Sequence, residues 1–313
     1  MTDTHADSAE KLIRDRVHTL GIVGLGLLGG SFALRMRECF PHLHILGLAR
    51  RRESVREARQ AGIIDDGSTE PGAVLPEADL TVICTPVSTI INLARHNAEL
   101  WQSSAVVTDV GSVKGNIVET LTPMLNEYGV HFVGSHPMAG SEKFGLAHAD
   151  AQLYNGATVL VTPSAETDSQ ALKLVSAMWK AVGAAPVEMP AAVHDRALAR
   201  TSHLIHLLAA AAVEISLETD GAVHATGGGF RDFSRIAASS PEMWRQIFEM
   251  NREPLLEALQ AYQDKLRTLE HWVQAGDWDK IEDYFTRTGK MRTDWFRAWT
   301  AARQQNQTRE RYQ

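Results

Sequence analysis

Short apolar runs alternate with amphipathic stretches through the first 190 residues of the chain. The runs have the length of buried strands and cover residues 20–23, 44–48, 80–84, 105–109, 131–134, 158–162 and 185–188. Stretches of helix-forming composition, such as residues 52–61 and 90–99, lie between several of them. This alternation predicts an α/β fold with a mostly parallel, doubly wound sheet, in which ligands bind at the carboxyl ends of the strands.

The pattern changes after Pro190, where strand-like runs stop and helical periodicity continues through residues 191–217, 253–275 and 279–300. We therefore expect three parts: a flexible polar arm at 1–16, an α/β domain at 17–189 and an all-α domain at 190–313. Residues 204–215 are rich in Ala and Leu nearly all round, which predicts a buried helix. In a small domain such a helix can be buried between subunits, so we expect a homodimer.

Three glycines follow the first strand-like run in the spacing G-x-G-x-x-G. Gly24 permits a tight strand-to-helix turn, Gly26 lets a pyrophosphate approach the backbone, and Gly29 lets the helix pack on the strand. Glycine-rich turns are common, but this one lies between a strand and a helix, and a second strand follows. The glycines open a stretch of helix-forming composition at residues 31–38. The segment therefore predicts a dinucleotide site, with the pyrophosphate at the N-terminus of that helix.

The end of the second strand bears on the choice of cofactor. NAD-binding chains usually carry Asp or Glu there to bind the ribose 2′-hydroxyl. This chain has Ala49 followed by Arg50, Arg51 and Arg52, and the first carboxylate is Glu53. Guanidinium groups suit a 2′-phosphate, so the pattern favours NADP while leaving NAD possible. The alternative is a solvated basic helix start with no role in binding.

Composition narrows the class of protein further. The net charge of −7 argues against general nucleic-acid binding, and the 313 residues contain no apolar stretch long enough to span a membrane. Two cysteines, Cys39 and Cys84, are too few for a disulfide framework and fit a reducing compartment. We therefore expect a cytoplasmic protein with neither nucleic acid nor membrane as a partner.

Candidate chemistry gathers where the predicted strands end. Thr85 and Pro86 either line the nicotinamide pocket or form an ordinary turn. Ser112, in D-V-G-S-V-K, either caps a helix or reaches a substrate hydroxyl. His136 follows a strand among small residues and turn formers, which is where binding sites are commonly built.

The helical domain contains a second group of candidates. Three consecutive glycines at 227–229 predict a helix break that presents arginines to an anion; the alternative is a loop with salt-bridged arginines. His203 and His206 are three residues apart and share a helix face. With His136 they suggest a metal site, but no carboxylate has a matching spacing and hydride transfer needs no metal, so we expect none.

Taken together and in order, these blocks resemble the prephenate/arogenate dehydrogenase family. The blocks are G-x-G-x-x-G, T-P-V, D-V-G-S-V-K, S-H-P-M-A-G-S-E, S-H-L-x-H and G-G-G-F-R-D-F-S-R-I-A, between residues 19 and 244. The resemblance implies a nicotinamide-dependent oxidative decarboxylation in tyrosine biosynthesis, and a C-terminal domain for dimerisation and substrate binding. We expect the single-function form, without an ACT or chorismate mutase domain.

The same resemblance implies roles for individual residues. His136 matches the family's catalytic base toward the substrate hydroxyl, and Ser112 matches a serine that orients that hydroxyl. The residues expected to bind substrate or border its cleft are Arg235, His206, Arg231, Glu142 and Asp232. Those expected to bind the cofactor are Gly24, Gly26, Leu27, Leu28, Gly29, Arg50, Arg51, Thr85 and Pro86.

Several alternatives stay open. Prephenate and arogenate differ by a ketone or an ammonium in the side chain; a hydrogen-bond donor at His206 favours prephenate, the expected substrate, over arogenate. A β-hydroxyacid dehydrogenase would use a lysine of the helical domain as base, but none lies near the glycine-rich break, and Lys265 is far along the chain. A non-catalytic NADP-sensing dimer would need only the glycines and arginines.

Overall fold

A computed structural model describes residues 4–140 and 143–311, with side chains for residues 9–140 and 143–301. The chain divides into two compact units: one contains the residues up to His194 and those from Arg303 onward, and the other is Asp195–Ala302. None of the helices in the described part of the chain is both long enough and apolar enough to cross a membrane.

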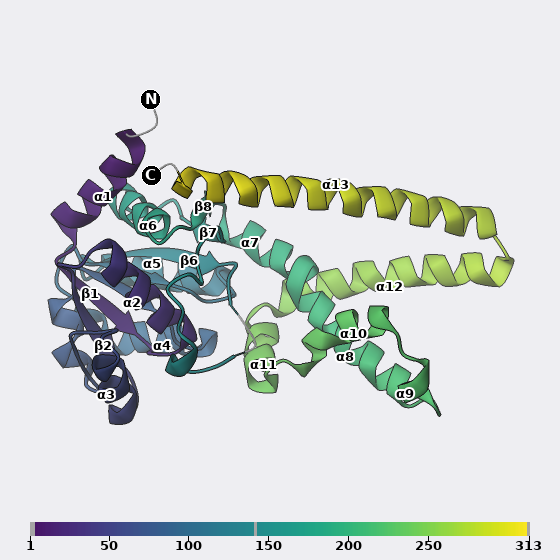
Figure 1. The fold of residues 1–313 in the computed structure, drawn as a ribbon, viewed down its shortest axis with the longest axis horizontal. Coiled ribbons are helices and arrows are strands. Elements are labelled where there is room, and N and C mark those ends of the chain that lie inside the picture. The colour runs from purple at the N-terminus through teal and green to yellow at the C-terminus, as the bar shows by residue number, and fades with distance from the viewer. Residues whose placement is uncertain (1–3, 141–142, 312–313) are drawn as a thin grey trace. The chain divides into compact units, whose positions relative to one another are not determined.

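The first unit is built on one eight-stranded sheet (Figure 1), with the strand order β3-β2-β1-β4-β5-β6-β7-β8. Its strands are β1 (Thr19–Val23), β2 (His44–Leu48), β3 (Asp66–Ser68), β4 (Leu80–Ile83), β5 (Val106–Asp109), β6 (His131–Pro137), β7 (Thr158–Thr162) and β8 (Ala185–Glu188). Every neighbouring pair is parallel except β6 and β7. The doubly wound α/β fold is confirmed, although the short polar strand β3 was not predicted.

The helices of this unit are α1 (Thr4–Arg16), α2 (Leu27–Cys39), α3 (Arg52–Gln60), α4 (Val87–Asn97), α5 (Gly115–Asn126) and α6 (Ser169–Ala181), and α7 (Ala191–Leu198) begins at its end. Three aromatic rings join α2 and α6 in the core: Phe32 lies 5.2 Å from Trp179, and Tyr154 lies 5.3 Å from Trp179 between ring centroids. All three side chains are fully buried, so they fix the position of α2 against the sheet.

The expectation of a flexible arm at residues 1–16 is wrong for the part of it that the structure describes. Residues Thr4–Arg16 form α1, and Ile13 is only 1% exposed in the core of the first unit. Ala9 and Leu12 pack against the same core. Apolar side chains at positions 9, 12 and 13 have helical spacing and form a stripe that packs on α6, so burial outweighs the polar composition.

The strand order of the sheet reverses next to β1. From β1 the chain proceeds to β2 and β3 on one side, and then returns to β4 on the other side of β1. This reversal of strand order is the switch point at which open α/β sheets bind ligands, beyond the carboxyl ends of the strands. Gly24 follows β1 and Thr85 follows β4, so both lie at this point.

The second unit is helical throughout its described length. After a π-helical segment (Ala199–His203) come α8 (Leu204–Leu217), α9 (Ala222–Ala225), α10 (Gly228–Ser234), α11 (Pro241–Met250), α12 (Arg252–Ala275) and α13 (Trp278–Arg311). The part of α13 from Arg303 onward groups with the first unit. We expected α8 to be buried nearly all round. In the single chain only Leu204 and Ala209 of this helix are buried, while Ile205, Ile215 and Leu217 are exposed.

Candidate functional site

The three glycines of the first loop occupy three different environments, which match the three predicted reasons for glycine. Gly24 has φ of +101°, and a Cβ there would lie 2.7 Å from the carbonyl oxygen of Cys84. A Cβ on Gly29 would lie 2.1 Å from the Gly24 carbonyl oxygen. A Cβ on Gly26 would meet nothing within 4 Å. Gly24 and Gly29 are thus required by close contacts, whereas Gly26 borders open space that a ligand can approach.

The start of α2 has the properties of an anion site. The helix begins at Leu27, its N-cap Gly26 supplies no side-chain hydrogen bond, and its first turn has no acidic residue. The first amides of a helix have no partner within the helix, and the dipole favours negative charge there. The Tyr154 hydroxyl donates to the Leu28 carbonyl oxygen at 2.9 Å and anchors this turn. The loop therefore fits the pyrophosphate of a dinucleotide.

The arginines after β2 are free to meet a ligand. Arg50, Arg51 and Arg52 are all exposed, and Arg51 is the N-cap of α3. The nearby carboxylate of Asp65 lies before β3, where it accepts hydrogen bonds from Arg37 at 2.9 Å and from the backbone of β2 at 2.8 Å. These bonds hold the Asp65 carboxylate at the amino end of the strands. It is therefore not a partner for the arginines, which lie at the carboxyl end.

The turn after β4 also begins a helix. Pro86 is the N-cap of α4, and the Thr89 hydroxyl lies 2.7 Å from the Pro86 carbonyl oxygen and 2.9 Å from the Thr85 hydroxyl. Thr85 is half-buried and Pro86 is exposed. Both predicted interpretations, a turn and a wall of the nicotinamide pocket, are compatible with this geometry.

A buried ion pair that was not predicted lies at the carboxyl end of β5. Lys114 and Asp109 are fully buried and in direct contact. Asp109 also accepts from the backbone N–H groups of Gly111 at 2.8 Å and Ser135 at 3.2 Å, while Lys114 Nζ donates to the Ser135 carbonyl oxygen at 3.1 Å. The pair therefore ties the loop after β5 to β6. Its sequence signal was the D-V-G-S-V-K block itself, in which an acid ends a strand and a lysine precedes a helix.

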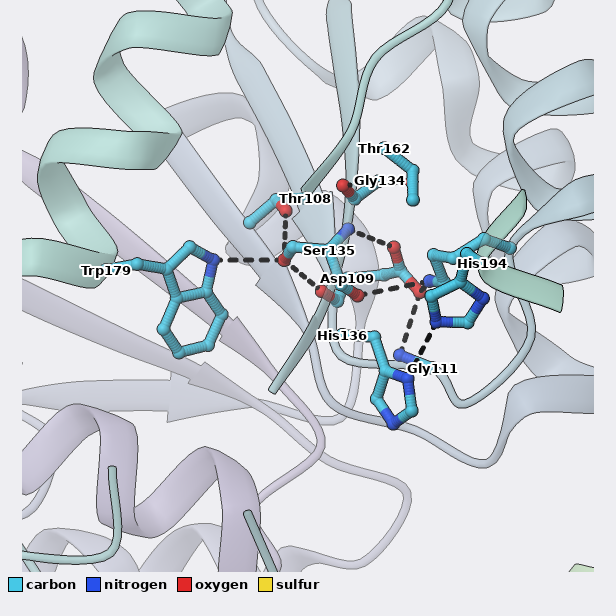
Figure 2. Close-up of polar contacts among 10 residues, drawn as sticks. Thr108, Asp109, Gly111, Gly134, Ser135, His136, Thr162, Trp179 and His194 are labelled. Carbon is cyan, nitrogen blue, oxygen red and sulfur yellow. Dashed lines mark hydrogen bonds and ion pairs between the residues drawn. The ribbon is translucent and has the colours of Figure 1, made fainter. Parts of the chain in front are cut away.

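Ser135 is the centre of the hydrogen bonds drawn in Figure 2. Its hydroxyl donates to the Asp109 carbonyl oxygen at 2.6 Å, accepts from Trp179 Nε1 at 3.0 Å and lies 2.9 Å from the Thr108 hydroxyl. Together with the contacts of Lys114, these bonds hold the backbone of β6 directly before His136.

Ser112 does not cap a helix. The helix α5 begins at Gly115, and Lys114 occupies the N-cap position. Ser112 lies in the preceding loop, half-buried, and within the described residues its hydroxyl makes no hydrogen bond. The capping alternative is therefore wrong, because the loop continues for two more residues before the helix starts.

His136 lies inside a strand rather than after one. The strand β6 pairs with β5 only as far as Val133, and then continues by antiparallel pairing with β7, where His136 is opposite Leu160. This pairing extends the strand past the point where its apolar run ends. The side chain is 9% exposed, and its Nδ1 lies 2.9 Å from Nε2 of His194, which is fully buried (Figure 2). His194 was not predicted, since a histidine opening a helix 58 residues away carries no sequence signal.

In the second unit, His203 and His206 share a helix face, as expected, and both lie against Trp244. His206 stacks on the Trp244 ring at 3.9 Å between centroids, and His203 makes an edge contact at 6.0 Å. His203 is buried, and its Nδ1 lies 2.9 Å from Nδ2 of Asn251, which also donates to the Asp195 carbonyl oxygen. Because Nδ2 is a donor, His203 Nδ1 is the acceptor.

The tautomer of His206 follows from its partner. Its Nδ1 lies 2.9 Å from the Ser202 carbonyl oxygen, which can only accept, so Nδ1 carries a proton. Burial lowers the pKa of His206, and the positive charge of Arg235 lowers it further, although the bond to Ser202 acts in the opposite direction. A neutral ring in this tautomer has a lone pair on Nε2.

The helix break was predicted at the three glycines 227–229, but only the first of them lies outside a helix. The chain is extended at Thr226 and Gly227, while Gly228 and Gly229 already form the first turn of α10. Arg231 makes an exposed ion pair with Asp232 at 2.9 Å, and Arg235 is exposed at the end of the same helix. Both arginines therefore lie on the helix that follows the break, but Arg231 already has Asp232 as an ionic partner.

The structure describes these candidates as two groups, each within its own unit. His136, Ser112 and the glycine loop belong to the first, and His206, Arg231, Asp232 and Arg235 belong to the second. Glu142 lies outside the described residues. Among the side chains that are described, no group of three or more His, Cys, Asp or Glu residues is placed to hold a metal ion.

Two family models match the chain, one on either side of Pro190. Residues 32–188 match the model described as prephenate dehydrogenase, nucleotide-binding domain. Residues 190–287 match the model described as prephenate dehydrogenase, dimerization domain.

Individual proteins give the same result. The chain is 33% identical to the prephenate dehydrogenase of Bacillus subtilis over 273 residues, which is 85% of this chain and 73% of that protein. Its structure is similar to the crystal structure of prephenate dehydrogenase from Aquifex aeolicus in complex with hydroxyphenyl propionate and NAD+, with a TM-score of 0.82, 34% identity and coverage of 88% and 98% of the two chains. It is also similar to Synechocystis arogenate dehydrogenase, with a TM-score of 0.79, 28% identity and coverage of 88% and 99%.

Proposed function

The chain belongs to the prephenate dehydrogenase family, and we propose that it converts prephenate to 4-hydroxyphenylpyruvate by oxidative decarboxylation. It is an NAD(P)-dependent oxidoreductase of tyrosine biosynthesis. The observation that carries the proposal is His136, held nearly buried at the carboxyl end of β6, on the edge of the sheet that also carries the glycine loop. The related proteins are dehydrogenases, which gives no support to a non-catalytic NADP sensor.

The cofactor site is proposed at the glycine loop. The open space at Gly26 and the uncapped start of α2 would receive the pyrophosphate, with the amides of Leu27 and Leu28 as donors. When bound, the nicotinamide supplies the hydride acceptor. Thr85 and Pro86 follow the adjacent strand β4 and would line the nicotinamide pocket.

NADP is the proposed cofactor, with NAD as the alternative. Arg50 and Arg51 are exposed after β2, where they would bind a 2′-phosphate by charge-assisted hydrogen bonds. The similar Aquifex aeolicus structure contains NAD+, so the preference rests on these arginines alone. A comparison of kcat/KM for the two cofactors tests it.

In the proposed reaction, His136 accepts the proton of the ring hydroxyl while the hydride leaves the carbon that bears it. Histidine titrates near neutral pH, which suits a general base. Ser112 would donate to or accept from the same hydroxyl and orient it. The carbonyl that forms is conjugated with the carbon bearing the ring carboxylate. The bond to that carboxylate then breaks, carbon dioxide leaves, and its electron pair restores an aromatic ring whose oxygen takes up a proton.

We assign substrate binding to residues of the helical unit. Arg235 would bind a substrate carboxylate through both guanidinium nitrogens. His206, held in place by Trp244 and Ser202, would contact the substrate side chain. Arg231, Asp232 and Glu142 stay candidates for substrate binding, and the ion pair between Arg231 and Asp232 makes Arg231 the weaker candidate for an anion.

Arogenate is the second candidate substrate, and the tautomer of His206 is the observation that favours it. The Nδ1 proton is already donated to Ser202, and the lowered pKa keeps the ring neutral near pH 7. The Nε2 lone pair would accept from the ammonium of arogenate, but it has no proton to donate to the ketone of prephenate. Prephenate therefore no longer has the advantage that a donor at His206 would provide. Steady-state kcat/KM values with the two substrates decide between them.

We propose that the protein is a homodimer through its helical unit. Residues 190–287 match a dimerization domain, and the apolar side chains of Ile205, Ile215 and Leu217 on α8 are exposed in the single chain. A second copy would cover them. Sedimentation equilibrium should give twice the chain mass of 34.4 kDa, whereas a stable monomer would contradict this proposal.

The variant His136→Asn tests the proposed base. It should lower kcat by at least about 100-fold, the usual contribution of a positioned base, while leaving the Kd of the cofactor unchanged. The matched control is His131→Gln, at the other end of β6, which should keep wild-type turnover. If His136→Asn turned over normally, the base would have to be reassigned.

A further inference from the structure

His194 makes a direct contact with the proposed base. Its Nε2 lies 2.9 Å from Nδ1 of His136, and the two rings meet edge to face with centroids 5.1 Å apart. Both side chains lie in the first unit; His194 is fully buried and His136 is 9% exposed. The hydrogen bond is therefore shielded from competition by water.

A hydrogen bond between two neutral imidazole rings has only two arrangements, because one nitrogen must donate and the other must accept. In the first, His136 Nδ1–H donates to His194, and His136 Nε2 carries a lone pair. In the second, His194 Nε2–H donates to His136 Nδ1, and His136 Nε2 carries a proton. Only the first arrangement leaves His136 able to accept a proton from a substrate.

We propose that His194 is a positioning residue that holds His136 as the Nδ1–H tautomer, so that Nε2 is the basic nitrogen. This inference rests on the proposed function, in which His136 removes the proton of the substrate hydroxyl. His194 acts through His136 and does not itself touch the reacting atoms.

The start of α7 fixes the place of His194. His194 lies in the first turn of this helix, where its backbone N–H donates to the Pro190 carbonyl oxygen at 3.0 Å. Its Nε2 accepts from His136 when its own proton is on Nδ1.

The contact also strengthens during the reaction. Once His136 has taken the substrate proton it is an imidazolium, and its Nδ1–H then donates to His194 as a charge-assisted hydrogen bond. A bond that is stronger after proton transfer than before stabilises the transition state relative to the ground state, so it increases kcat rather than affinity. Burial preserves this difference, since it limits the access of water to the two rings.

The first experiment replaces the acceptor. His194→Phe keeps a ring of similar size without nitrogen, and should lower kcat about 10- to 100-fold, the worth of one charge-assisted bond, with the KM of the substrate and the Kd of the cofactor changed less than about threefold. His194→Gln offers an amide oxygen in place of Nε2 and should recover most of the rate. His131→Gln, on the same strand as His136, is the control and should keep the wild-type rate.

A second measurement separates positioning from a purely structural role. In the background of His136→Asn, His194→Phe should cause no further loss of turnover, because residues that act as one unit are not additive. A role in folding alone would lower the remaining turnover in both backgrounds.

Nitrogen NMR of histidine-labelled protein reads the tautomer without any need for turnover or for the Phe variant to fold. The His136 signals, identified by their loss in His136→Asn, should show the proton on Nδ1. A proton on Nε2 of His136, or full kcat in His194→Phe, would overturn the proposal. Normal turnover of His136→Asn would instead contradict the proposed function, so the two failures are distinguishable.

Discussion

Removal of one member of the buried ion pair between Lys114 and Asp109 should strongly destabilise the first unit. In Lys114→Met the ammonium is replaced by an apolar chain of similar length, and the Asp109 carboxylate stays buried. Among the residues that the structure describes, that carboxylate retains the backbone donors of Gly111 and Ser135, and the Ser135 carbonyl oxygen loses the Lys114 bond of 3.1 Å. Breaking a fully buried pair from one side costs about 3–5 kcal/mol in free energy of unfolding.

The magnitude can be checked by calorimetry. For a unit of this size each kcal/mol corresponds to about 2–4 °C in Tm, so Lys114→Met should lower the Tm by roughly 6–20 °C. The double variant Lys114→Met/Asp109→Asn removes the isolated charge and should recover part of that loss. The control is Lys173→Met, an exposed lysine on α6, which should change the free energy of unfolding by less than about 0.5 kcal/mol.

Two results would contradict the proposed cause of the instability of Lys114→Met. If Lys114→Met were destabilised by less than about 1 kcal/mol, the buried charge would have to be compensated in another way. If the double variant were no more stable than the single one, the loss would not come from an isolated carboxylate.

Three further predictions follow from the first unit. Gly26→Ala should keep the wild-type Tm but weaken cofactor binding at least tenfold, because its Cβ enters the open space proposed for the pyrophosphate. Gly29→Ala should lower the Tm, because its Cβ would collide with the Gly24 carbonyl oxygen. Equal Tm values for the two variants would contradict the assignment. Arg51→Gln should raise the KM of NADP about tenfold or more and change that of NAD less than threefold, and equal effects on both would remove the 2′-phosphate role. Asp168 is the N-cap of α6, and the bond from the Ala171 N–H lowers its pKa. The contribution of this carboxylate to the free energy of unfolding is therefore complete above the unfolded pKa of about 3.9 and is lost as the pH falls through the lower folded value. Asp168→Ala should cost about 0.5–2 kcal/mol at pH 7, and this difference should vanish in strong acid.

Local patterns predicted most of the fold. The strand-like runs and the glycine spacing depend on neighbours in the sequence, so seven of the strands and the environments of Gly24, Gly26 and Gly29 agree with expectation. The flexible arm was wrong because a short apolar stripe can bury a polar segment once a partner helix exists. The burial of α8 was overestimated for the single chain, since composition does not say what covers a helix.

The candidate site was predicted less completely, because its important contacts join distant segments. His136 was found from its block, but its partner His194 is 58 residues away and comes close only through the extension of β6 along β7. The contacts of Lys114 depend likewise on the alignment of β5 and β6. No periodicity encodes the tautomer of His206, which is set by its bond to Ser202.

The proposed reaction is tested by the rate at which the purified protein forms reduced nicotinamide, with prephenate or arogenate and with NADP or NAD, in all four pairings. We expect turnover that requires His136, with a higher kcat/KM for NADP than for NAD. Absence of turnover in every pairing, from protein that still binds the cofactor, would contradict the proposed reaction and the roles given to His136 and His194.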